Sequence, residues 1–149
     1  MLSIYILALP ICIADFTYHR IPNIYLIFIF YCIGIEGIFS GFASLGFLSL
    51  TLLILLLLHW LVGLGMGDVK LIFLITLALH IEGLSQLALL FLAICLGAML
   101  AVICESLCRG HIGRTIAMAP SIFMGTALYL GAGNLNFLQE YADALVNSW

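Results

Sequence analysis

Charged side chains are scarce in this sequence. Only four residues are Lys or Arg and seven are Asp or Glu among 149, which gives a formal net charge of -3. So few basic residues provide neither the positive surface that binds nucleic-acid phosphates nor a polybasic patch for anionic lipids. We therefore expect no nucleic-acid partner.

Cysteine patterns for a metal site and the features of a cleavable leader are also missing. The five cysteines lie mostly in apolar runs and lack the CxxC or Cys/His spacing of a zinc site. We expect them to be small side chains in a helix bundle, with no metal and no other cofactor. The first apolar run has no basic segment ahead of it, and Asp15 and Arg20 follow it where a small-residue cleavage site would stand. We interpret this run as a retained helix.

Apolar residues, in contrast, fill the sequence. Hydrophobic residues make up 66% of it and the mean hydropathy is +1.33, far from the composition of a water-soluble domain. Because about 20 apolar residues cross a hydrocarbon core, long apolar runs predict membrane helices. Short polar joints separate six such segments, at about 1–17, 24–39, 45–64, 69–82, 84–105 and 115–133. We predict an all-α, polytopic membrane bundle of about six helices in one domain, 1–149, with Pro10 interrupting the first helix and a polar tail from Asn134.

The positions of the basic residues predict how this bundle is oriented. Arg20 lies between the first and second segments, Lys70 just after the joint between the third and fourth, and Arg109 and Arg114 between the fifth and sixth. Basic residues are enriched in cytoplasmic loops of membrane proteins. We therefore expect these joints at the cytoplasmic face and the N-terminus outside.

Two aspartates stand at the edges of the apolar segments. Asp15 ends the first segment and Asp68 precedes the fourth, so the chain crosses the membrane twice between them and both lie at the cytoplasmic face. An ionisable residue at a membrane edge favours a functional interpretation, although ion pairs with Arg20 and Lys70 are a structural alternative. Residues i and i+2 of a helix do not face each other, so Lys70 is poorly placed to neutralise Asp68 and is better suited to reach lipid phosphates.

A pair of close carboxylates can hydrolyse an amide. One keeps a proton while the other is ionised, so that the ionised member deprotonates water and the protonated member stabilises the oxyanion and protonates the leaving nitrogen. Asp15 ends its helix and Asp68 begins its own, and a helix dipole disfavours an anion at the C-terminus and favours one at the N-terminus. We therefore expect Asp15 to hold the proton and Asp68 to act as the base, an order that Arg20 could reverse.

Residues near each aspartate suggest how it is positioned. Gly65 and Gly67 flank Asp68 and permit close backbone approach or a positive φ. Pro22 suits a helix start and Asn23 is available for hydrogen bonds in the turn after Asp15. His59, near the end of the third segment, is expected to pack in the bundle with a carbonyl partner.

These residues resemble the motifs of the prepilin peptidases, membrane aspartic proteases named for a GxGD motif. The first motif runs from Asp15 to Asn23 and the second from Gly65 to Leu71, and a third, around Pro120, is similar to the entrance of the family's last helix. The resemblance implies a peptidase of the bacterial inner membrane that removes the basic leader of type IV prepilin-like precursors at the cytoplasmic face. It assigns catalysis to the two aspartates.

The resemblance also implies what accompanies the catalytic pair. Arg20, Pro22, Asn23, Gly65, Gly67, Lys70 and Pro120 would shape the site. The partners would be a prepilin or pseudopilin precursor and the lipid bilayer. The sequence is similar to the compact, peptidase-only branch that serves tight-adherence pili, because it has no room for the cytoplasmic zinc and methyltransferase domain of larger relatives.

Two alternative functions remain. A small transporter or scaffold could use the two aspartates to bind a cation or a proton, although the two halves of the sequence show no inverted repeat. The presenilin and signal-peptide-peptidase group shares the GxGD core but cuts within transmembrane helices. In this sequence the first aspartate instead lies beside a basic turn, and the chain is much shorter.

Overall fold

The fold is entirely helical in the part of the chain that the structure describes. The computed structural model describes residues 2–18, 20–41, 44–109 and 118–146, with side chains at 6–18, 20–39, 41, 44–107 and 118–133. Within these ranges there are six helices and no strands, which confirms the all-α prediction. The helices are α1 (Leu2–Tyr18), α2 (Asn23–Ser40), α3 (Leu45–Val62), α4 (Met66–Ala78), α5 (Leu84–Arg109) and α6 (Ala119–Val146).

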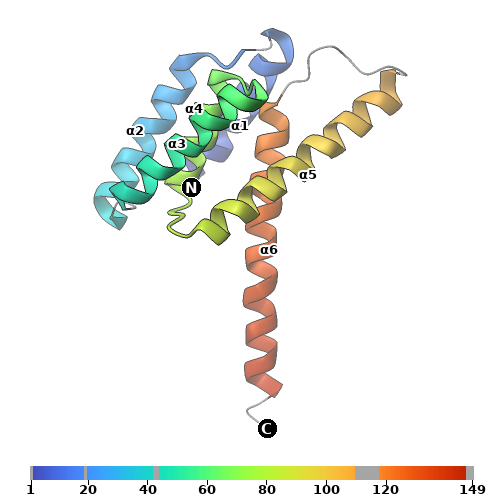
Figure 1. The fold of residues 1–149 in the computed structure, drawn as a ribbon. Coiled ribbons are helices and arrows are strands. Elements are labelled where there is room, and N and C mark those ends of the chain that lie inside the picture. The colour runs from blue at the N-terminus through green and yellow to red at the C-terminus, as the bar shows by residue number, and fades with distance from the viewer. Residues whose placement is uncertain (1, 19, 42–43, 110–117, 147–149) are drawn as a thin grey trace.

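Consecutive helices run in alternating directions (Figure 1). The end of α1, the start of α2, the joint between α3 and α4 and the start of α6 lie at one end of the bundle, called here the motif end. The joints that follow α2 and α4 lie at the other end, called the opposite end. Asp15, near the end of α1, and Asp68, in the first turn of α4, are therefore at the same end, as the number of crossings predicts.

Helix α4 forms the centre of the bundle. It packs against α2, α3 and α6, and seven of its 13 residues are buried. A helix that is apolar on every side is stable only when neighbouring helices or lipid cover it. At 1.5 Å per residue it is about 20 Å long, shorter than a hydrocarbon core of about 30 Å. The structure therefore uses α4 as a core helix that holds the motif end in place.

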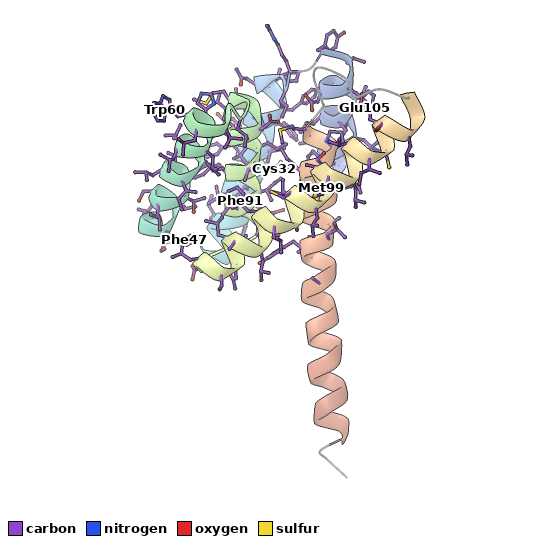
Figure 2. All side chains as sticks on the ribbon, turned by 45° about the vertical axis from the view of Figure 1, so that its right-hand side comes forward. Cys32, Phe47, Trp60, Phe91, Met99 and Glu105 are labelled. Atoms are coloured by element: carbon purple, nitrogen blue, oxygen red, sulfur yellow. The ribbon has the colours of Figure 1, made fainter. Side chains whose placement is uncertain are left out.

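Large apolar side chains cover much of the outer surface. Two helical spans, Leu45–Val62 and Leu84–Leu107, are long and apolar enough to cross a membrane, yet only 11% and 22% of their residues are buried. The core helix of a soluble protein would be mostly buried, whereas these helices direct apolar side chains outward. Trp60, at the motif end of α3, is 81% exposed (Figure 2). A surface of this kind needs an apolar environment or a partner to cover it.

Two glycines allow α5 and α6 to cross closely. A Cβ on Gly125 would lie 2.5 Å from the Cα of Ile94, and a Cβ on Gly97 would lie 2.7 Å from the backbone oxygen of Ser121. Neither position has space for a side chain, and small residues at such crossings bring helix backbones together. The close crossing therefore holds α5 and α6 together.

The structure differs from the expected segments in four helices. Helix α4 begins at Met66 and ends at Ala78 where 69–82 was expected, and α5 continues to Arg109 where an end near 105 was expected. Helix α1 is continuous through Pro10, because the fully buried Ile11 and the buried Ala14 anchor the turn that follows. Helix α6 begins at Ala119 rather than 115, and it continues past Asn134 to Val146, where a polar tail was predicted. Residues 134–146 contain neither proline nor glycine and include several strong helix formers, so nothing in this stretch ends the helix.

Candidate functional site

Asp15 connects α1 to the start of α6. Its side chain is only 6% exposed, and its Oδ2 accepts a hydrogen bond from the backbone N–H of Ala119 at 2.8 Å. The first N–H groups of a helix lack partners within the helix, and Met118, the residue ahead of α6, has no side-chain oxygen to cap them. Pro120 has no N–H at all. Asp15 therefore caps α6 from a position 104 residues earlier in the sequence.

Asp68 lies in the first turn of α4 and is partly buried. Its carboxylate folds back over Gly65, the N-cap of the helix: a Cβ at Gly65 would lie 2.6 Å from Asp68 Oδ2. The φ of Gly65 is -59°, so this glycine is needed for space and not for a left-handed backbone. Two roles were expected for Gly65, close approach or a positive φ, and the structure shows close approach.

The two carboxylates are close enough to influence each other. Asp68 precedes the apolar segment 69–82, and burial, together with the nearby charge of Asp15, raises the pKa of Asp68 from 3.8 to about 6. Burial disfavours a carboxylate because it loses water, and a neighbouring negative charge acts in the same direction. The motif end therefore brings Asp15 and Asp68 into one electrostatically coupled pair.

The geometry favours a distribution of the proton opposite to the expected one. Asp15 accepts a backbone N–H bond at the positive end of α6, and a carboxylate accepts such a bond more strongly than a carboxylic acid does. Burial and the charge of Asp15 raise the pKa of Asp68, so Asp68 keeps a proton to a higher pH than an ordinary aspartate does. The expectation from the sequence considered only the dipole of each aspartate's own helix and omitted α6.

Residues after Asp15 contact residues around Asp68. Lys70 Nζ donates a hydrogen bond to Asn23 Oδ1 at 3.2 Å, which joins α4 to the start of α2. A Cβ on Gly67 would lie 3.2 Å from the Cβ of Ile21, so the missing side chain allows the turn to pack closely against α4. Asn23 was expected to bond within its own turn, but its oxygen bonds to the other motif. The hydrogen bond and the close packing therefore hold the two motifs against each other.

Other predicted site residues have structural positions. Pro22 is the N-cap of α2, and its carbonyl accepts a bond from the N–H of Tyr25 at 3.2 Å. Pro120 lies in the first turn of α6, which agrees with its expected place at the helix entrance. Arg20 is exposed, and among the described residues no ion pair joins it to Asp15. The Nδ1 of His59 contacts the carbonyl oxygen of Leu64, the type of partner expected for it.

Three features of the motif end were not predicted from the sequence: the Ala119 N–H, Gly63 and Ser121. The Ala119 N–H has no sequence signature, because any residue other than proline provides a backbone donor. Gly63 ends α3 with a φ of 75°, and a glycine directly after an apolar run is a recognised signal for such an end. Ser121 is 1% exposed and its hydroxyl has no partner among the described residues, whereas the buried Thr51, Thr76 and Thr126 each donate to a carbonyl of their own helix.

Metal-binding side chains do not gather in the part of the chain that the structure describes. Within it, no three His, Cys, Asp or Glu side chains form a group that could hold a metal ion. Arg114 lies outside the described residues, and Arg109 ends α5. Searches among protein families, curated proteins and solved structures found no match to this chain.

The geometry defines what this site can do chemically. One carboxylate is held as a hydrogen-bond acceptor at a helix N-terminus, and a second, nearby carboxylate retains its proton to a higher pH than usual. Such a pair provides a general base and a general acid side by side.

Proposed function

We propose that this chain is a membrane-embedded aspartic endopeptidase of the prepilin-peptidase type. The observation that carries the proposal is the coupling of Asp15 with Asp68 at one end of the bundle, where burial and the Asp15 charge raise the pKa of Asp68 to about 6. Two aspartates with different environments are the minimum equipment for metal-independent hydrolysis of an amide. The resemblance of the surrounding motifs selects a prepilin peptidase from the enzymes that use such a pair.

In the proposed reaction, ionised Asp15 is the general base and protonated Asp68 is the general acid. Asp15 takes a proton from a water molecule as the water oxygen attacks the scissile carbonyl carbon. Asp68 hydrogen-bonds the oxyanion that develops on the carbonyl oxygen. When the C–N bond breaks, the pair of aspartates gives one proton to the leaving nitrogen. Because the pair has already gained one proton from the water, it returns to its starting protonation state. Two products result, a carboxylate and an amine.

The exposed apolar surface of α3 and α5 supports placing this bundle in a membrane. In the proposed arrangement about six helices lie in a bacterial inner membrane, the N-terminus is outside and the motif end faces the cytoplasm. Arg20 and Lys70 lie at the motif end, and α5 ends at Arg109, so the positive-inside preference supports this orientation. The opposite end has Glu82 and His80 in its α4–α5 joint and no Lys or Arg there.

The proposed substrate is a prepilin or pseudopilin precursor. Its basic leader would remain in the cytoplasm and its apolar helix would enter the bilayer beside the bundle, so the bond between them would lie at the depth of Asp15 and Asp68. A site at the cytoplasmic end of the helices suits a cut at this junction. A cut in the middle of a transmembrane helix would require deeper carboxylates.

Co-expression with a prepilin tests the proposal. The full chain is produced with a prepilin that has a basic leader, in bacteria lacking their own prepilin peptidase, and the N-terminus of the mature pilin is determined by mass spectrometry. We expect cleavage after the leader with the wild-type chain, and a loss of at least about a hundredfold in processing rate with Asp15→Asn or Asp68→Asn.

A matched control is available at the opposite end, where Glu82 is exposed. Glu82→Gln removes one carboxylate charge without affecting the pair, so processing should continue at the wild-type rate. Membrane fractionation checks that all variants accumulate equally. If both aspartate variants are inserted in the membrane and still process the precursor, the proposed function is wrong.

A further inference from the structure

A groove lies along the bundle between α2 and α3, both of which pack on α4. Its volume is about 410 Å³, within the range of small-molecule sites. The residues that line it come from all three helices, and most of them are aliphatic or aromatic. They are Asn23, Leu26, Ile27, Phe30, Leu52, Val69, Lys70, Phe73 and Leu74.

The groove is polar at one end only. Asn23 is the first residue of α2 and Lys70 is near the start of α4, so both polar side chains belong to the motif end. Phe30 lies seven residues further along α2, which corresponds to roughly 10 Å deeper into the bundle. None of the described residues that line the groove is acidic. The groove thus matches a molecule with an anionic head and an apolar chain.

Lys70 can bind an anion at the mouth of the groove. Its side chain is exposed, and among the described residues its ammonium donates one hydrogen bond, to Asn23 Oδ1 at 3.2 Å. An ammonium has three N–H donors, so two remain for other acceptors. Asn23 holds the charge in position, because the hydrogen bond restricts the long lysine side chain to one direction. A phosphate oxygen is a suitable acceptor for such a fixed ammonium.

We propose that this groove binds one acyl chain of an anionic phospholipid, with the lipid phosphate on Lys70. The site requires the membrane location but not the peptidase activity. Charge argues against a prepilin as occupant, because Lys70 would repel its basic leader and the residues that line the groove include no carboxylate to pair with it. An anionic head group is complementary to Lys70, and the apolar lining beyond it suits an acyl chain.

Native mass spectrometry of the full chain in detergent micelles tests this site. The protein is equilibrated with equal amounts of phosphatidylglycerol and phosphatidylcholine that have identical acyl chains, and the lipid that stays bound is measured. We expect retention of one phosphatidylglycerol. Lys70→Met, which keeps the length of the side chain but removes its charge, should reduce the preference for phosphatidylglycerol about fivefold, and Lys70→Arg should preserve it.

Two tryptophan variants on α3 test the acyl chain. Leu52 lines the groove, so Leu52→Trp should fill it and reduce binding of both lipids. Leu53, the exposed neighbour outside the groove, is the matched control, and Leu53→Trp should leave lipid binding unchanged. Circular dichroism establishes that both variants are folded.

Three results would overturn the proposal. The first is an unchanged lipid preference in Lys70→Met. The second is equal loss of lipid in Leu52→Trp and Leu53→Trp. The third is displacement of the bound lipid by inorganic phosphate or by a prepilin helix peptide, which would make the groove a free-phosphate site or a substrate site. Absence of prepilin cleavage by the wild-type chain, together with the expected lipid binding, would count against the peptidase proposal alone.

Discussion

The two ends of the bundle use polar side chains in different ways. At the opposite end, the ring nitrogens of His80 contact the backbone oxygens of Ala78 at 3.2 Å and Gly41 at 3.1 Å, so this side chain ties two loops together. At the motif end, Asp15 is buried and bonds a different helix, and it disfavours the ionisation of Asp68. Loop closure thus needs only backbone partners, whereas electrostatic coupling of two carboxylates needs neighbouring helices that bring them together.

Removing the Asp15 carboxylate should produce the largest change in stability. Asp15→Ala leaves the buried Ala119 N–H without an acceptor, and we expect a loss of about 2 kcal/mol in the free energy of unfolding. Asp15→Asn retains an acceptor oxygen and should lose less. Unfolding by dodecyl sulfate in mixed micelles measures both.

Glu82 is the matched position at the opposite end for this comparison. Because Glu82 is exposed, Glu82→Ala should remain within about 0.5 kcal/mol of wild type. Equal stability of Asp15→Ala and Glu82→Ala would mean that the cap on α6 contributes nothing.

A methyl group at Gly65 should disturb the site with a smaller effect. Its Cβ would lie 2.6 Å from Asp68 Oδ2, so Gly65→Ala displaces this carboxylate, and we expect prepilin processing to slow on the order of tenfold. Gly46, on α3 near the opposite end, has no atom within 4 Å of an added Cβ, and Gly46→Ala should process normally. Similar rates for the two variants would show that the position of Asp68 is not critical.

The pH dependence of stability should report the coupling of the pair. The pKa of Asp68 is about 6 in the fold against 3.8 ordinarily, so the folded chain binds more protons between these values and its stability falls as pH rises from about 4 to 6. Because Asp68 is partly exposed, the change should be on the order of 1 kcal/mol. Asp68→Asn should remove this component in unfolding titrations at several pH values. A rise in stability over this interval that depends on Asp68 would contradict the coupling.

A change at His80 should have the smallest effect. His80→Ala removes the contact with Gly41, and we expect a loss of about 0.5 kcal/mol in stability with no change in prepilin processing. Parallel unfolding and co-expression assays compare the two quantities. Reduced processing in a stable His80→Ala variant would show that the two ends are functionally linked.

Several features of the site were predictable because they depend on local order along the chain. Counting apolar segments placed Asp15 and Asp68 at one end without any knowledge of packing. Gly65 and Gly67 were expected to permit close approach, and each does so, to Asp68 and to Ile21 respectively. The bond between Lys70 and Asn23 was not predicted, because neither position indicates which distant polar group it will meet.

The sequence alone determined the helical class, the six segments and the end of the bundle at which the aspartates lie, since apolar runs and polar joints are local properties of the chain. The tertiary structure decided the raised pKa of Asp68 and the central position of α4. Both depend on packing between distant segments: the Ala119 N–H that holds Asp15 in place beside Asp68 is 104 residues away along the chain. Burial then leaves Asp68 as the member that keeps its proton to higher pH.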